Sequence, residues 1–390
     1  MFIFNKRKKK GMSLDEVSNI LSDVRTPITY SFTPINLEEE KKKFFDSETY
    51  NPQFKYTLLK NRNREIFQSL EELDYIDDVD PRISDFYLEL IKSKELVHNL
   101  YQSVGNNEMV TKFSEERYGS VSPKLFQNAT LVIKGNVSKY NVIDNERLKG
   151  SKKLSTNDVI DIMKYFLDLY QLNDWNVIIS KKNLSKNIRV GVKDKEIVLG
   201  SDQVSKSAFR LRKTIVHEIG THVLRWYNGL LSGIPALTKS NNAGYHDIEE
   251  GLASYNEEIS GLMDFSTLRQ KALLVYAIYI GKNLSFRQLY TVLRGFVSKN
   301  TAFNLTLRVK RGLSDTSIPG IYAKDASYFR GFRMVRKKIE NNPSLYKKLY
   351  AGKISFKQIS WVDDGLIPMP QYIYDIDTYN SHFKKLGILK

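Results

Sequence analysis

Two histidines five positions apart, His217 and His222, place the strongest constraint on the local fold of this chain. An α-helix turns by about 100° per residue, so side chains four apart lie within about 40° of each other and side chains five apart diverge by about 140°. The two rings can face a common point only if the helix contains a π-helical turn, a feature often found at functional sites. Gly220 lies inside the run, where a residue without Cβ best tolerates the distortion. The spacing therefore predicts a helix with a π-helical turn at residues 217–222.

The same run has the composition of a metal site. It reads His-Glu-Ile-Gly-Thr-His, and in the related zinc-peptidase motif the glutamate after the first histidine is the general base. The chain has five histidines and no cysteine, so a metal site must use histidine or carboxylate ligands. A histidine pair more often lies in a core or at a surface, but the apolar neighbours indicate a buried helix in which unpartnered polar groups would be costly. We therefore expect one zinc ion per chain, with Glu218 accepting a proton from the zinc-bound water.

A third protein ligand is expected, because a catalytic zinc site keeps one coordination position open. Residues 246–253, His-Asp-Ile-Glu-Glu-Gly-Leu-Ala, have the pattern of a second helix. Glu250 is the first choice for the ligand, with Glu249 and His246 as alternatives. The small residues Gly251 and Ala253 should let this helix approach the first one closely.

The pattern along the chain predicts an α+β fold. A capped amphipathic helix should begin at Ser155 or Thr156, and three β-branched runs follow it at residues 177–179, 188–192 and 197–199. The histidine helix should begin near Ser205 or Ser207 and end at Asn228-Gly229. Most of the remaining chain should be helical, with an extended aromatic tail after Pro370.

These elements suggest three parts. Residues 1–25 form a basic tail, residues 26–150 a mainly helical N-terminal region, and residues 151–390 a zincin-like metallopeptidase domain made of a small sheet and the histidine helix.

The formal charge of +16 predicts attraction to acidic partners, including an acidic protein. Nucleic acid is a weaker fit, because no nucleic-acid-binding module accompanies the charge. At the N-terminus apolar residues precede basic ones, the reverse of a secretory signal. The most apolar later segment, residues 272–280, is far shorter than the ~20 residues that span a bilayer. With no cysteine present, we expect a cytoplasmic protein without a transmembrane segment.

Three motifs follow one another in this chain: the His-Glu-Ile-Gly-Thr-His run, Asn228-Gly229, and Glu-Gly-Leu-Ala at residues 250–253. Together they resemble the microtubule-associated tyrosine carboxypeptidase family, formerly a domain of unknown function. Its bacterial members are called flavohemoglobin expression-modulating QEGLA motif proteins. The resemblance extends from about residue 26 to the C-terminus and includes residues 324–331.

The resemblance implies that His217, His222 and Glu250 bind zinc and that Glu218 is the catalytic base. Animal members remove a C-terminal tyrosine, notably from α-tubulin, although nothing in this sequence indicates a microtubule-binding region. One departure is Glu249, which stands where the bacterial motif has glutamine.

A carboxypeptidase also needs a cation for the terminal carboxylate of its substrate, and arginine can bind it through two parallel hydrogen bonds. Tyr328 could donate a hydrogen bond to the oxyanion, and the candidate cations are Lys324, Arg330 and Arg333. Each of these residues could equally belong to an ordinary amphipathic helix with a basic face.

We therefore expect zinc-assisted hydrolysis of a peptide bond near a C-terminus, acting on a peptide or protein. The alternatives are an endopeptidase or amidase with the same site, a non-catalytic zinc-containing regulatory protein, and a basic nucleic-acid-binding protein.

Overall fold

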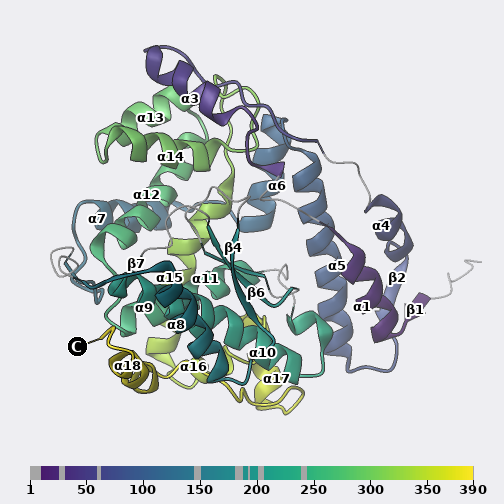
Figure 1. The fold of residues 1–390 in the computed structure, drawn as a ribbon. Coiled ribbons are helices and arrows are strands. Elements are labelled where there is room, and N and C mark those ends of the chain that lie inside the picture. The colour runs from purple at the N-terminus through teal and green to yellow at the C-terminus, as the bar shows by residue number, and fades with distance from the viewer. Residues whose placement is uncertain are drawn as a thin grey trace, which may run out of the picture. The chain divides into compact units, whose positions relative to one another are not determined.

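The computed structural model in Figure 1 describes residues 10–25, 31–58, 63–144, 151–180, 188–191, 194–200, 206–238 and 244–389. The described residues divide into two compact units, each discontinuous in sequence. Unit 1 takes its residues from 10–127 and 273–326, and unit 2 takes its residues from 128–240, 244–272 and 327–389. The two histidines and residues 246–253 all belong to unit 2.

Three β-branched runs form a small sheet in unit 2, as predicted. Strand β4 (Asn176–Ser180) pairs in parallel with β6 (Glu196–Gly200), and β6 pairs antiparallel with β5 (Arg189–Gly191). The predicted second run also included Val192, which lies outside the described residues. A separate antiparallel ladder joins β3 (Lys153–Leu154) to β7 (Lys206–Ser207).

Helix α8 (Thr156–Asp168) precedes the sheet and lies against β4. Its N-cap is Ser155, which forms a capping box with Asp158, so the predicted start is confirmed. Val159, Met163 and Phe166 lie on its buried face, three or four residues apart.

The histidine helix consists of three consecutive segments. These are α9 (Ala208–His217), a π-helical turn (Glu218–Val223) and α10 (Leu224–Leu231). The N-cap Ser207 accepts a hydrogen bond from the backbone N–H of Arg210, which confirms one of the two predicted starts. Ser205, the other predicted start, lies outside the described residues.

The predicted end of this helix at Asn228-Gly229 is wrong, because α10 continues to Leu231. Gly229 serves close packing instead, since a Cβ atom there would lie 2.2 Å from the carbonyl oxygen of Leu237. Asn228 accepts hydrogen bonds from the backbone N–H groups of Gln371 and Tyr372 and thereby fixes a later segment on α10.

The rest of unit 2 is helical. It contains α11 (Tyr245–Ile259), the first part of α12 (Phe265–Gly281), nearly all of α15 (Ala326–Asn341), α16 (Leu345–Lys348), α17 (Ile359–Asp363), α18 (Ile376–Lys385), and short 3₁₀ turns at Pro235–Thr238 and Phe356–Gln358.

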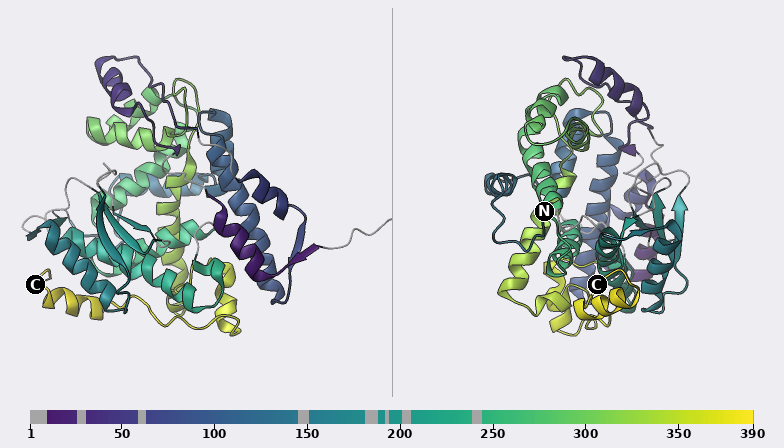
Figure 2. Two further views of the ribbon diagram at one scale, coloured as in Figure 1. Left: turned by 45° about the vertical axis from the view of Figure 1, so that its right-hand side comes forward. Right: turned by 60° about the vertical axis from the view of Figure 1, so that its left-hand side comes forward.

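Helix α18 corrects the prediction of an extended tail. Asp375 is its N-cap and accepts a hydrogen bond from the backbone N–H of Thr378. Tyr379 and Phe383, four residues apart, pack against Phe166 of α8, each with its ring centroid 5.0 Å from that of Phe166. The two helices lie side by side in Figure 2, where α18 is yellow.

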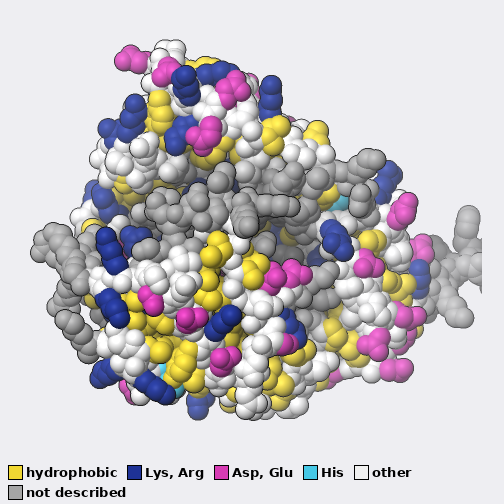
Figure 3. Space-filling view, viewed as in Figure 1, with side chains coloured by type: hydrophobic (Ala, Val, Ile, Leu, Met, Phe, Trp, Pro, Cys, Tyr) yellow, Lys and Arg dark blue, Asp and Glu magenta, His cyan; other side chains and the backbone are white. Residues whose placement is uncertain are grey.

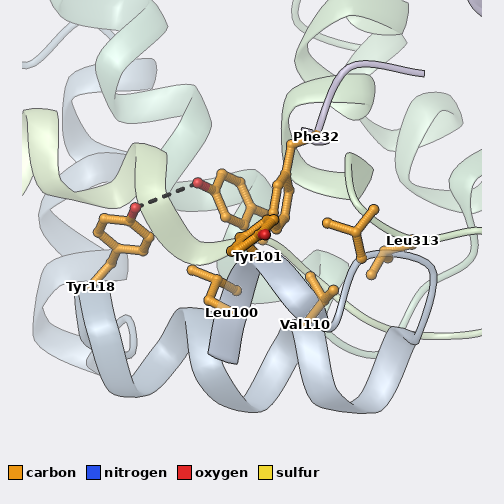
Figure 4. Packing of buried hydrophobic residues seen from close by; sticks show 8 residues of the cluster. Phe32, Leu100, Tyr101, Val110, Tyr118 and Leu313 are labelled. Atoms are coloured by element: carbon orange, nitrogen blue, oxygen red, sulfur yellow. Dashed lines mark hydrogen bonds between the residues drawn. The ribbon is translucent and has the colours of Figure 1, made fainter. Parts of the chain in front are cut away.

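Unit 1 is mainly helical. It contains α1 (Leu14–Asp23), α3 (Leu37–Asp46), α4 (Arg64–Leu70), α5 (Pro81–Gln102), α6 (Asn107–Tyr118), the start of α7 (Pro123–Ile133), the end of α12, α13 (Phe286–Arg294), α14 (Lys299–Lys310), a 3₁₀ turn at Ala323–Asp325, and the short parallel strands β1 (Lys10–Met12) and β2 (Leu73–Ile76). Figure 4 shows part of its core, where Phe32 packs on Tyr322 and the hydroxyl groups of Tyr118 and Tyr322 are 3.5 Å apart.

Helices thus predominate beside small sheets, which confirms the predicted α+β class. On the face shown in Figure 3, lysine and arginine side chains alternate with acidic and apolar ones. Among the described residues, no helix combines the length and the apolar character needed to cross a bilayer.

Candidate metal centre

The π-helical turn brings the two histidine rings together. It occupies Glu218–Val223, as the spacing of five predicted, and the ring centroids of His217 and His222 are 4.9 Å apart with the ring planes at 83°. Gly220 also allows close packing against Tyr374, because a Cβ atom at position 220 would lie 2.9 Å from the Cδ2 atom of Tyr374. The turn therefore needs glycine at this position for packing as well.

Helix α11 brings a carboxylate to the two rings. One possible ligand atom from each of His217, His222 and Glu250 lies within 4.8 Å of the other two. The Oε2 atom of Glu250 is 3.6 Å from the Nε2 atom of His217. Of the three side chains considered for the third ligand, Glu250 is the one that lies in this cluster.

Gly251 has a different role from the one predicted. A Cβ atom at Gly251 would lie 2.5 Å from the carbonyl oxygen of Gly331 in α15. A Cβ atom at Gly331 would in turn lie 2.0 Å from the carbonyl oxygen of Asp247. The glycine pair therefore lets α11 pack closely on α15, and the expectation that Gly251 serves the approach to the histidine helix is wrong.

A second carboxylate supports His217 from behind. The Nδ1–H group of His217 donates a 2.7 Å hydrogen bond to Glu257. The other oxygen of Glu257 is 3.6 Å from the Nζ atom of Lys213 and 3.8 Å from that of Lys271. Sequence reasoning missed Glu257, although it follows Glu250 by seven residues and so shares one face of α11 with it.

Glu249 supports His222 in the same way. The Nδ1–H group of His222 donates a 2.8 Å hydrogen bond to Glu249, which also forms ion pairs with Arg225 and Lys353. All three charged side chains are buried, and Arg225 is fully enclosed. Arg225 further donates to the carbonyl oxygens of Leu349 and Ile354.

This arrangement can hold a divalent metal ion. In the neutral imidazoles, an Nδ1–H that donates to a carboxylate leaves the Nε2 lone pair of His217 and of His222 available to a metal ion, which would displace the proton that the metal-free His217 ring carries. Histidine ligands of metal ions characteristically donate their second ring N–H to a carboxylate in this way. Two histidines and one glutamate, with room for water, are also the donor set of several catalytic zinc sites.

The ionisation of these groups follows from their neighbours. Burial raises the pKa of Glu250, but the hydrogen bond with His217 and the charges of nearby histidines outweigh it and lower the pKa to about 2. Burial lowers the pKa of His217, but Glu250 and Glu257 raise it to about 10. The metal-free site therefore strongly favours a positive charge next to these carboxylates.

The remaining predicted site residues lie in varied surroundings. Glu218 lines a cavity of about 620 Å³ together with His217. The ring of Tyr328 lies edge-on to that of His246, with centroids 5.9 Å apart, and His246 precedes Glu250 by one helical turn.

The predicted substrate-binding cations do not line this cavity. Arg330 donates two hydrogen bonds to the carboxylate of Asp247, at 2.7 and 2.8 Å. Arg333 donates to the hydroxyl of Tyr140 at 2.8 Å. Lys324 belongs to unit 1. The cations that line the cavity are Arg210 and Lys213.

Comparison with known proteins identifies the family. The sequence model of the family described as microtubule-associated tyrosine carboxypeptidase matches residues 42–386. The chain belongs to this family. Its relatives include microtubule-associated tyrosine carboxypeptidase 1 of Rattus norvegicus, with 24% identity over 397 residues, covering 97% of this chain and 73% of the rat protein. A putative tyrosine carboxypeptidase of Mus musculus is 26% identical over 386 residues, covering 94% of this chain and 62% of the mouse protein. The resemblance inferred from the three motifs is therefore confirmed.

Proposed function

We propose that this chain is a zinc-dependent carboxypeptidase with a zincin-like catalytic unit, in which His217, His222 and Glu250 hold the metal ion and Glu218 is the general base. The observation that carries the proposal is that one possible ligand atom from each of the three residues lies within 4.8 Å of the other two. A π-helical turn brings the two histidines together, and their spacing of five residues calls for such a turn only if both rings face one point. The names of the relatives, tyrosine carboxypeptidases, support exopeptidase activity at a protein or peptide C-terminus.

The chemistry divides between the ion and the side chains around it. When bound, zinc supplies a Lewis acid that polarises the scissile carbonyl and acidifies the attacking water. Glu218 follows His217 directly and lines the same cavity, so its carboxylate can accept the proton of that water. The protonated Glu218 then passes this proton to the nitrogen of the leaving amine.

Other residues orient this machinery. Glu257 and Glu249 fix the ring orientation and tautomer of the two histidines through the 2.7 and 2.8 Å hydrogen bonds to Nδ1. Tyr328, packed on His246 one turn before Glu250, is the candidate donor to the oxyanion. Small edge strands precede the histidine helix, and β5 lies beside the π-helical turn, which suits an extended peptide laid along the sheet edge.

The direct test is mass-resolved cleavage of a peptide library with free C-termini by the zinc-loaded protein. Wild type should release single C-terminal residues, and Glu218→Gln should lose at least about 100-fold of this activity because the general base is gone. A matched variant, Glu95→Gln at an exposed position of α5, should cleave like wild type. Internal cuts would show an endopeptidase instead. One tightly bound zinc ion with no cleavage of any peptide or protein would indicate a regulatory protein and contradict the proposal.

A further inference from the structure

The cavity beside Glu218 has a wall built from two helices of unit 2. One side is the face of α9 that carries Arg210, Lys213 and His217, which follow one another at helical spacings of three and four residues. The other side is the first turns of α12, with Ser266, Thr267 and Gln270. A molecule attacked at the metal centre would therefore extend from His217 along α9 into this space.

Lys213 is already engaged within this wall. Its ammonium group donates to Asp264 at 3.0 Å and to the hydroxyl of Thr267 at 2.8 Å, and it lies 3.6 Å from Glu257. Two of the three donors of the ammonium group are therefore used in hydrogen bonds, and the carboxylate of Glu257 lies close enough for an ion pair. Asp264 also caps α12 by accepting from the backbone N–H of Thr267. Neither Lys213 nor the start of α12 offers a ready anion site.

Arg210 differs from Lys213 in this respect. Its side chain is exposed and lines the cavity, and among the described residues its guanidinium group has no hydrogen-bond or ion-pair partner. It lies two helical turns before His217, about 10 Å along the axis of α9. One extended amino-acid residue spans about 3.5 Å, so a terminal residue and an extended arginine side chain together cover this distance.

We propose that this cavity receives the residue released by the enzyme and that Arg210 binds the terminal carboxylate of that residue. The planar guanidinium group can hold the carboxylate through two parallel hydrogen bonds. The exposed amide of Gln270 on the opposite wall is a further donor for it. This inference rests on the proposed peptidase function and assigns the role that sequence reasoning gave to Lys324, Arg330 and Arg333 to a different cation.

The proposal predicts that the effect of changing Arg210 depends on whether the substrate has a free C-terminal carboxylate. The substrates are a peptide that ends in tyrosine with a free carboxylate and the same peptide with a C-terminal amide. Arg210→Ala should lower kcat/KM for the acid by about 10–100-fold, mainly through KM, because a charge-assisted pair is lost. It should leave kcat/KM for the amide unchanged. Arg210→Lys should restore part of the loss, and Lys164→Ala, which removes an exposed cation of α8, should change neither substrate.

Binding to Glu218→Gln separates this proposal from the proposed function. In that background the acid should bind about 10–100-fold more tightly than the amide, and adding Arg210→Ala should abolish the difference. This result would support Arg210 as the carboxylate site even if wild type cleaved no peptide. Equal binding of acid and amide, no measurable binding of the acid, or a preference for the acid that survives Arg210→Ala would each overturn the inference.

Discussion

Glu249 and Glu257 each accept a hydrogen bond from the Nδ1–H group of a histidine, His222 and His217 respectively, but the two carboxylates lie in different surroundings. Glu249 accepts from His222 and is held by Arg225 and Lys353, all within the interior of unit 2. Glu257 accepts from His217 and is held by Lys213 and Lys271 at the wall of the cavity, where the side chain of Lys213 is 16% exposed. Burial alone would raise the pKa of both carboxyl groups, but their cations and histidines lower it in both cases.

This difference indicates which cluster stabilises the fold and which one acts at the metal site. Arg225 joins Glu249 to two backbone carbonyls more than 120 residues later in the sequence, so this cluster also fixes the segment around Leu349 and Ile354. The cations of Glu257 form longer contacts with it, at 3.6 and 3.8 Å, and their hydrogen bonds go to side chains, those of Asp264, Thr267 and Ser254. We infer that changes near Glu249 destabilise the protein, whereas changes near Glu257 act chiefly on metal binding.

The largest effect is expected for Arg225→Met. The substitution leaves Glu249 with one cation fewer and two buried carbonyl groups without their donor, so the free energy of unfolding should fall by about 3–5 kcal/mol. Urea unfolding of the metal-free protein measures it. The matched variant Lys271→Met should cost only about 1 kcal/mol, since Lys271 is 3.8 Å from Glu257 and Lys213 remains. Equal losses for the two variants would contradict the division of roles.

Glu257→Gln should weaken zinc binding by about 10–100-fold, because the His217 ring loses the carboxylate that fixes its orientation and raises its basicity. Competition with a chromophoric chelator measures this affinity. Unfolding of the metal-free variant should show a smaller loss than Arg225→Met. An unchanged zinc affinity would mean that the hydrogen bond to His217 does not position a metal ligand.

A third buried carboxylate, Asp325 in unit 1, is held by Arg308 and Arg311 and contacts no histidine. Burial raises its pKa, but the two guanidinium groups lower it to about 2. A folded pKa below the unfolded value means that its contribution is present above pH 4 and is lost as the pH falls toward 2. Asp325→Asn should therefore lower the free energy of unfolding by about 2 kcal/mol at pH 7 and by about half of that amount at pH 3. It should not change the affinity for zinc.

Measuring unfolding of wild type and Asp325→Asn across this pH range tests the point. A loss of zinc affinity in Asp325→Asn as large as in Glu257→Gln would remove the distinction between carboxylates that touch a histidine and those that do not.

Local features were predictable from the sequence. The β-branched runs around Val177, Val190 and Ile197, the cap at Ser155 and the π-helical turn all follow from spacing and residue type within a few positions. The position of Glu250 beside the two histidines was predictable because Glu250 begins a motif in a helix of its own.

Features that depend on distant contacts were not predictable. Lys353 lies 104 residues from Glu249, and no local pattern connects them. The roles of Gly229 and Gly251 follow from the backbone that each one meets, Leu237 and Gly331 respectively, and not from their neighbours in sequence. Helix α18 was missed because the nearby proline Pro370 suggested an extended chain, whereas its cap and aromatic face lie just beyond it.

The most direct test of the account is a zinc titration of the purified chain and two variants, with binding followed by a competing chelator. We expect one zinc ion per chain for wild type and for Glu218→Gln, because Glu218 acts on water and not on the metal. Glu250→Gln should bind zinc at least about 100-fold more weakly, because a ligand is lost rather than a group behind one. Wild-type protein that binds no zinc, or Glu250→Gln that binds it as tightly as wild type, would contradict the metal centre described above.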